Sequence, residues 1–164
     1  MDKEELIKRI ENNVDFTSDK YWDGFWKRKY GLGGGGEDPD AASKALAQTH
    51  AFLWSGRTGN PNDPDRRLNL TVREDSGYFL TDEISGLDLS SDTLINGYRW
   101  ERKPVFEGVI LPLIREYGEA EYRAMQESFV RTAYTVGGLT VFPRRSENND
   151  KESINRARKR LLFG

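Results

Sequence analysis

The stretch LNLTVREDSGYFL at residues 68–80 decides the fold class. Apolar and polar residues alternate from Leu68 to Val72, which is typical of a β-strand with one buried face. The run ending in YFL resembles a neighbouring strand, and the EDSG between the two has the composition of a turn. The stretch therefore predicts an antiparallel hairpin.

Helical patterns flank this hairpin on both sides. Residues 3–12 and 119–131 each place apolar side chains at the helical period. A longer helix is predicted over residues 39–54, because Asp38 suits the N-cap and Pro39 suits the first turn. The hairpin thus lies between helices.

Further strands are expected after the hairpin. Residues 89–100 can continue the sheet, and residues 134–136 and 139–142 resemble strands joined at Gly137 and Gly138. We therefore expect an α+β fold, with a small antiparallel sheet covered by two or more helices.

The composition limits the chemistry available. The chain has no Cys and one His, which excludes disulfides, thiolate nucleophiles, and zinc sites with Cys ligands or several His ligands. Charged residues make up 32% of the 164 residues and hydrophobic ones 36%, values that suit one soluble globular domain. No stretch reaches the roughly 20 apolar residues that span a bilayer, and the charged start MDKEELIKRIE is unlike a signal peptide. We expect a cytoplasmic protein without a membrane partner.

Three parts are expected within this single domain. Residues 1–36 hold an N-terminal helix, an aromatic segment and the glycine-rich GLGGGG; residues 37–143 form the main α+β body; residues 144–164 form a basic tail. The tail has seven Lys or Arg against three acidic residues, so it carries +4, and the remainder carries −6 in a chain of net charge −2. This uneven charge favours a macromolecular partner for the body or the tail.

Several short motifs follow one another in a fixed order. Their positions are Asp38, Asp40, His50, Leu53, Trp54, Ser55, Ser90, Ser91, Asp92, Arg131, Tyr134, Thr135, Gly137, Gly138, Phe142, Pro143, Ile154, Asn155, Ala157 and Arg158. This order resembles an uncharacterised family of bacterial and prophage proteins of unknown function, over roughly Glu37 to Arg158. The resemblance implies candidate positions and a prophage-like setting, and it implies no activity. Related chains are expected to continue into a further helical segment after the position of Arg158.

His50 is the first candidate for catalysis. Histidine is the side chain that most naturally exchanges protons near neutral pH, and this chain has one. Trp54 and Ser55 follow about one helical turn later and are candidate binding residues. The alternative is a structural histidine that packs near the end of its helix.

A second candidate is an anion site near the end of the chain's last predicted helix. Arg131 and Tyr134 could donate to a phosphate, with Thr135 as a further donor, and Gly137 and Gly138 would let the phosphate approach the backbone. In the alternative, the arginine interacts with the helix dipole and the glycines form a turn between strands.

A third candidate is a metal site. Asp38, Asp40 and Asp92 are hard oxygen ligands of the kind that Mg²⁺ uses together with substrate phosphates. Their alternative role is structural, because the first two precede or open a helix and Asp92 is expected in a turn or cap. The sequence identifies no other cofactor.

Two cationic segments could contact nucleic acid. Residues 21–30 combine aromatic and basic side chains that could stack on bases and meet phosphates, and Arg158 lies in the basic tail. In the alternative, the aromatic side chains form core and the basic ones form a solvated surface.

Two hypotheses about function follow. The first is a phage- or defence-associated interaction protein that binds a macromolecular partner without catalysis. The second is a small enzyme or sensor that acts on a nucleotide or nucleic-acid phosphate, with His50 as the acid–base group and Arg131 as the phosphate clamp. We favour the first, because no strong catalytic motif is present. The partner would accordingly be a protein, a nucleotide or a nucleic acid.

Overall fold

A computed structural model describes residues 1–29, 38–57, 65–94, 107–108 and 111–143. The α-helices are α1 (Lys3–Glu11), α2 (Asp19–Lys29), α3 (Pro39–Ala42), α4 (Lys44–Trp54), α6 (Leu111–Tyr117) and α7 (Glu119–Ala133). The strands are β1 (Leu70–Glu74), β2 (Tyr78–Asp82), β3 (Asp88–Thr93) and β4 (Leu139–Pro143), and η3 (Val136–Gly138) is a short 3-10 helix. These elements confirm the predicted α+β fold.

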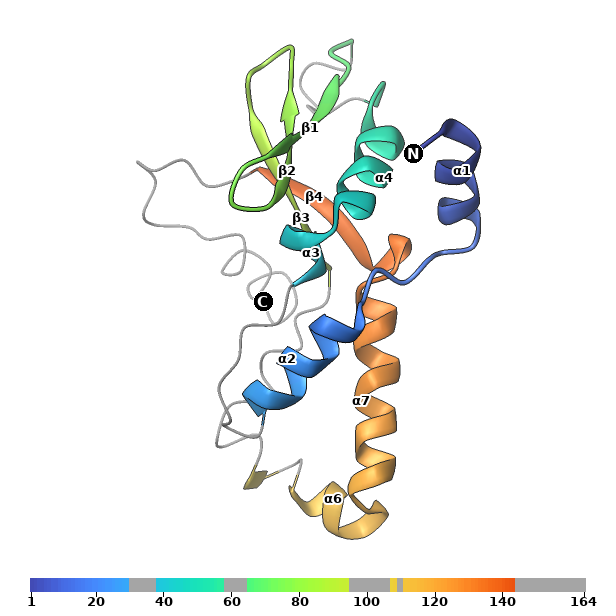
Figure 1. Ribbon diagram of the computed structural model, residues 1–164, viewed down its shortest axis with the longest axis vertical. Coiled ribbons are helices and arrows are strands. Elements are labelled where there is room, and N and C mark those ends of the chain that lie inside the picture. Colours follow the sequence, from blue (N-terminus) through green and yellow to red (C-terminus); the bar gives the residue numbers. More distant parts are fainter. Residues whose placement is uncertain (30–37, 58–64, 95–106, 109–110, 144–164) are drawn as a thin grey trace.

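The strands form one antiparallel sheet in the order β1-β2-β3-β4 (Figure 1). The predicted hairpin is confirmed, with Val72 of β1 opposite Leu80 of β2. On the other side, Leu80 is opposite Leu89 of β3. This register aligns the apolar positions of neighbouring strands, so the sheet can bury them together.

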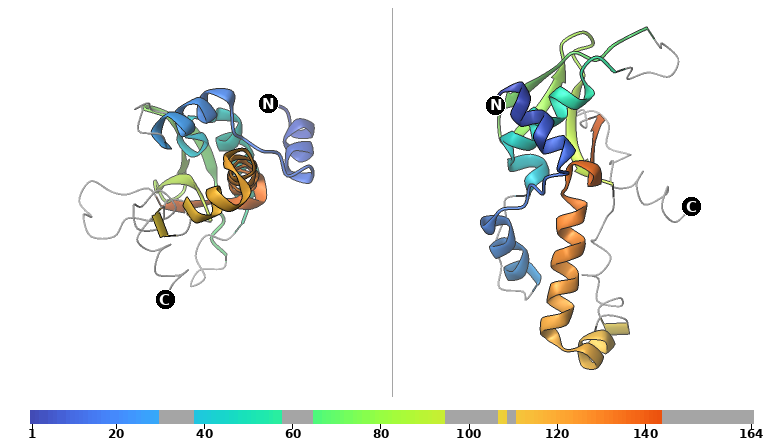
Figure 2. Two further views of the ribbon diagram at one scale, coloured as in Figure 1. Left: turned by 90° about the horizontal axis from the view of Figure 1, so that it is seen from below. Right: turned by 90° about the vertical axis from the view of Figure 1, so that its right-hand side faces the viewer.

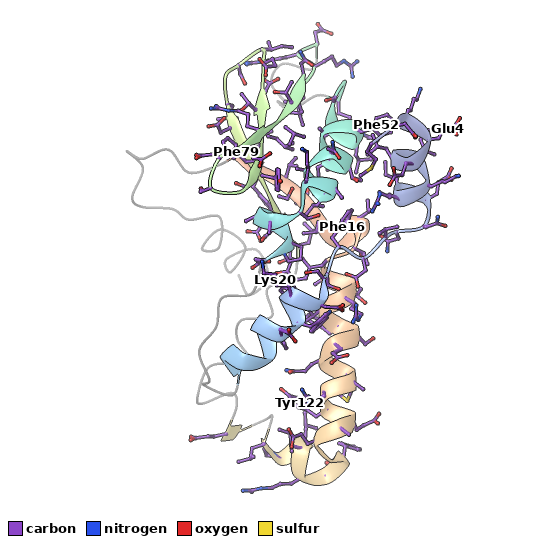
Figure 3. The ribbon with its side chains drawn as sticks, viewed as in Figure 1. Glu4, Phe16, Lys20, Phe52, Phe79 and Tyr122 are labelled. Atoms are coloured by element: carbon purple, nitrogen blue, oxygen red, sulfur yellow. The ribbon has the colours of Figure 1, made fainter. Side chains whose placement is uncertain are left out.

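Helix α4 connects two buried clusters. The first cluster lies between α4 and the sheet and consists of Ala47, Leu70, Leu80 and Leu89. The second joins the segment after α1 to α4, η3 and β4 and consists of Phe16, Leu46, Val136 and Leu139. Figure 3 labels Phe16 at this junction. Each fully buried side chain of this size contributes about 1.5–3 kcal/mol, so the two clusters fix α4 on the sheet.

Helix α7 extends away from the sheet, with α6 at its far end and α2 beside it (Figures 1 and 2). Its last residue, Ala133, leads directly into η3 and β4. The helix therefore holds Tyr134, its C-cap residue, next to the body of the protein. Within the described ranges, no helix is long and apolar enough to cross a membrane.

The expectation of one continuous helix over residues 39–54 is wrong. Ser43 has extended backbone angles, φ −92° and ψ 105°, and separates α3 from α4. Its hydroxyl accepts a hydrogen bond of 3.1 Å from the backbone N–H of Leu46, so it caps the second helix. The break occurs because serine caps a new helix better than it extends an existing one. It frees the short α3 to pack against β3 and β2.

Two further expectations are wrong. Asp92 lies inside strand β3, where it pairs with Thr140 of β4, and does not form a turn or cap. Residues 134–136 do not form a strand: Tyr134 ends α7 and Val136 begins η3. Pairing with β4 placed Asp92 in a strand, whereas residues 134–136 bond to the segment after α1, where Thr135 forms an isolated bridge with Asp15 and the N–H of Val136 donates to the carbonyl of Val14. The second expected strand at residues 139–142 is confirmed as β4.

Several predictions concern segments outside the described residues. These are the glycine-rich segment from residue 31 to 36, residues 95–100 of the expected continuation of the sheet, and the basic tail at residues 144–164, which includes Arg158. The first part of that continuation is confirmed, because β3 covers residues 88–93. The aromatic segment is helical as expected, because α2 covers residues 19–29.

Candidate functional site

Three aspartates from two distant segments meet where α3 packs against β3. Asp38 is the N-cap residue of α3, Asp40 lies in its first turn, and Asp92 lies in β3. The Asp40 carboxyl is hydrogen-bonded to the carboxyl groups of both Asp38 and Asp92. We call these three side chains the acidic cluster. The structure thus brings together all three residues proposed as metal ligands.

The acidic cluster holds a proton at neutral pH. Burial raises the pKa of Asp40 from 3.8 to about 9, and the negative charges of Asp38 and Asp92 raise it further. An ionised carboxylate has no proton to donate, so a hydrogen bond between two carboxyl groups requires a proton on one of them, and a single proton on Asp40 serves one of its two neighbours at a time. In the free protein, Asp40 is therefore a protonated acid.

Tyr134, the C-cap residue of α7, contacts the acidic cluster. Its hydroxyl donates a hydrogen bond of 2.5 Å to Oδ1 of Asp38. Burial, followed by the charge of Asp38, raises the pKa of Tyr134 above its ordinary value, so the hydroxyl remains a neutral donor. Although Asp38 occupies the N-cap position of α3, its side chain forms no capping hydrogen bond. Helix capping therefore does not explain why an aspartate occupies position 38.

His50 is buried in the core between α4 and β3. Its side chain is 0% exposed, and Nδ1 lies 2.7 Å from the hydroxyl oxygen of Ser91. Among the described residues, Nε2 has no hydrogen-bond partner. Burial lowers the pKa of His50 from 6.5 to about 4, so the ring is neutral at pH 7. The geometry is that of a packed core histidine and gives a substrate no access to the ring.

The burial of His50 predicts loss of stability in acid. Because the pKa is lower in the folded state, the contribution of the neutral ring is present above pH 6.5 and is lost as the pH falls toward 4. The loss should approach about 3 kcal/mol at the acid end. We expect the difference in unfolding free energy between wild type and His50→Gln to follow this pH profile in urea titrations. A difference that is constant between about pH 4 and 7 would contradict it.

Arg131 is bound to the segment before α2. Its Nη1 lies 3.0 Å from Oδ2 of Asp15 and 3.0 Å from the hydroxyl of Thr17. Its guanidinium also lies over the ring of Trp22, 4.9 Å from the ring centre. Arg131 and Tyr134 therefore have different partners, and the arginine ties α7 to the N-terminal region.

The backbone donors of the two glycines are also occupied. The N–H of Gly137 donates to Oδ1 of Asn13 at 2.7 Å. The N–H of Gly138 donates to the carbonyl of Thr135 at 3.0 Å and lies 3.2 Å from its hydroxyl. A phosphate site of the proposed kind needs such N–H groups to point at the anion. In this protein the N–H groups of Gly137 and Gly138 donate to other protein atoms and hold η3 in place.

Trp54 and Ser55 connect α4 to the sheet. The Ser55 hydroxyl accepts a hydrogen bond of 3.1 Å from the N–H of Leu70 at the start of β1. The Trp54 ring packs against the cluster beneath the sheet and lies 5.9 Å from the guanidinium of Arg57. Both residues therefore have structural partners in the fold.

The metal interpretation has a specific geometric requirement. In the described part of the chain, no group of three or more His, Cys, Asp or Glu side chains is arranged to hold a metal ion. The carboxyl groups of the acidic cluster interact with one another through Asp40, which is hydrogen-bonded to Asp38 and to Asp92. A family comparison bears on the same residues, because a family model described as a family of unknown function, DUF6994, matches residues 10–161. The chain belongs to DUF6994.

Among the curated proteins and the solved structures, none matches this DUF6994 chain. The matched range includes the acidic cluster, His50, Ser91 and Tyr134. The DUF6994 model therefore covers the whole candidate site.

Two contacts of this DUF6994 protein were not predicted from its sequence. Ser91 was noted within a motif and not as the partner of His50, although Leu89, Ser91 and Thr93 alternate on one buried face of β3. That period-2 pattern could have placed Ser91 opposite a helix. The partner of Arg131, Asp15, gave no local signal, since the two residues are 116 positions apart.

Proposed function

We propose that the protein is a non-catalytic binding protein whose acidic cluster receives a basic side chain of a protein partner. The observation that carries the proposal is the convergence of Asp38, Asp40 and Asp92, with Tyr134 donating to the first of them. Each of the three aspartates is half-buried, so the residues are confined and still partly exposed to solvent.

A cationic ligand suits this cluster on chemical grounds. Crowded carboxylates are costly to ionise when they are partly removed from water, and a bound cation offsets that cost. A guanidinium group has five N–H donors in a planar fork that matches carboxylate oxygens. The charge of −6 outside the tail would also attract a basic partner before contact.

The surroundings of the other candidate residues support a binding role without catalysis. His50 is packed in the core with Ser91, and Arg131 is paired with Asp15. The glycine N–H groups near the sheet donate within the protein. The phosphate hypothesis therefore has less support than the cation hypothesis. The phage or defence setting and the cytoplasmic location stay predictions.

Affinity capture with matched variants tests the proposal. Tagged wild type, Asp40→Asn and Asp92→Asn would be used to capture partners from a lysate of the native host, with quantification by mass spectrometry. Asp23→Asn, an exposed position on α2, removes the same charge elsewhere and is the control. We expect wild type and the control to enrich the same protein, and both cluster variants to lose at least about tenfold of it, because each removes an oxygen ligand of the cation.

Three outcomes would contradict the proposal. The first is a captured protein whose yield is unchanged in Asp40→Asn and Asp92→Asn. The second is Mg²⁺ binding in calorimetry that both variants abolish, which would assign the cluster to a metal. The third is a nucleotide that co-purifies with wild type and the control and is absent from the cluster variants. Binding of the isolated partner to wild type and variants, measured with purified proteins, confirms that the contact is direct.

A further inference from the structure

The ring of Tyr134 is held on several sides. It contacts the ring of Tyr21 edge-on, with centroids 5.2 Å apart and an interplanar angle of 65°. Its own carbonyl accepts a hydrogen bond of 3.1 Å from the N–H of Phe16, and it packs against the buried cluster around that residue. With the ring fixed in this way, the hydroxyl points at Oδ1 of Asp38.

Helix α2 supports this arrangement through its aromatic residues. Tyr21 contacts Trp22 edge-on, with centroids 5.2 Å apart, and Trp22 lies under the guanidinium of Arg131. Arg131 lies in the last turn of α7, whose C-cap residue is Tyr134. Its ion pair with Asp15 ties this helix end to the segment before α2. The aromatic segment identified in the sequence thus stabilises the position of one tyrosine at the candidate site.

The hydrogen bond from Tyr134 affects where the proton of the cluster lies. A carboxylate that accepts a hydrogen bond from a neutral donor is stabilised in its charged form. Asp38 receives such a bond, and Asp40 shares a hydrogen bond with it. The titratable groups that face this pair are Asp92 from β3 and Tyr21 from α2, which contacts the donor ring.

We infer that Tyr134 is the positioning residue of the acidic cluster: its hydroxyl fixes Oδ1 of Asp38 as a hydrogen-bond acceptor and leaves the shared proton on Asp40. This inference deepens the proposed function and rests on it for its use in binding, because Asp40 must release that proton when the cluster takes up a cationic side chain. Tyr134 would then determine the pH at which the cluster becomes fully charged.

The pH dependence of stability tests this role without any partner. Melting temperatures of wild type and Tyr134→Phe would be measured between about pH 7 and 11, a range that brackets the pKa of the folded cluster. The phenylalanine keeps the ring and its contacts and removes the donor. We expect the pH at which the fall in stability levels off, about 9 in wild type, to move upward by about one unit, because the ionised cluster has lost a hydrogen bond to a charged group. Tyr117→Phe, at an exposed position of α6, should leave the profile unchanged.

A second background separates positioning from packing. In Asp38→Asn, the Tyr134→Phe substitution should no longer move the pH profile, because the charged acceptor is gone. The inference is overturned if Tyr134→Phe lowers the melting temperature equally at every pH, or if the shift persists in the Asp38→Asn background. A wild-type profile with no fall in stability above neutral pH would also overturn it. None of these measurements involves a partner. Failure of this inference is therefore distinguished from failure of the proposed function, which the capture experiment tests.

Discussion

Replacing Asp40 with asparagine is expected to stabilise the folded protein at neutral and alkaline pH, although most substitutions of a half-buried residue destabilise. The pKa of Asp40 is about 9 in the folded protein and 3.8 in its ordinary environment, owing first to burial and then to Asp38 and Asp92. The folded state therefore binds a proton that the unfolded state releases. The favourable contribution is fully present below about pH 4 and is lost as the pH rises through 9.

The size of this effect follows from the same linkage. The contribution of Asp40 to the free energy of unfolding falls by about 1.4 kcal/mol per pH unit across this range. Asparagine is neutral at every pH, and its amide has two N–H donors for the carboxylates on either side. We expect Asp40→Asn to gain about 2 to 4 kcal/mol near pH 7 and more at higher pH.

Urea denaturation of both proteins between about pH 7.5 and 9 checks the prediction, because His50 is neutral in the folded and the unfolded state in this window and contributes a constant amount. Wild type should lose stability as the pH rises, and the variant should show a flatter profile. Asp23→Asn should follow the wild type. Parallel profiles for wild type and Asp40→Asn would show that Asp40 does not hold the proton.

Replacing Gly138 with alanine is expected to cost about 3 kcal/mol of stability, at the upper end of the usual range for overpacking. A Cβ at this position would lie 2.3 Å from the carbonyl oxygen of Thr132 and 2.5 Å from that of Ala133. Both are backbone atoms in the last turn of α7, so neither can move without disturbing the helix end. The same shift would displace Tyr134 from the acidic cluster.

The neighbouring glycine provides a matched control. A Cβ on Gly137 would lie 3.2 Å from the Oδ1 atom of Asn13, which belongs to a side chain that can move by a few tenths of an ångström. We expect Gly137→Ala to cost less than about 1 kcal/mol in the same urea titrations. Equal losses in the two variants would contradict the assignment of Gly138 to close packing against α7.

Sequence reasoning was most successful where a local pattern was sufficient. The helical period over residues 3–12 and 119–131 matches α1 and α7, and the alternation after Leu68 matches the β1–β2 hairpin. It failed where a distant segment decided the conformation. Pairing with β4 placed Asp92 in a strand. One failure had a local cause, because Ser43 caps a new helix within the predicted one.

The candidate site shows the same division. All three aspartates and Tyr134 were proposed from the sequence, in two separate roles: metal ligands and a phosphate site. The structure joins them through the hydrogen bond from Tyr134 to Asp38, across 96 positions. It also separates Arg131 from that group by pairing it with Asp15.

The sequence alone determined which elements could form and which chemistry was available: a hairpin between helices, carboxylates, one imidazole and no thiol. The tertiary structure decided which of these groups meet and in what state of charge. Burial and neighbouring charge keep a proton on Asp40 at neutral pH, burial keeps His50 neutral, and both effects depend on contacts made by residues far away in the chain. The physical reason is that periodicity reports local conformation, whereas solvation and charge interactions depend on what surrounds a side chain after folding.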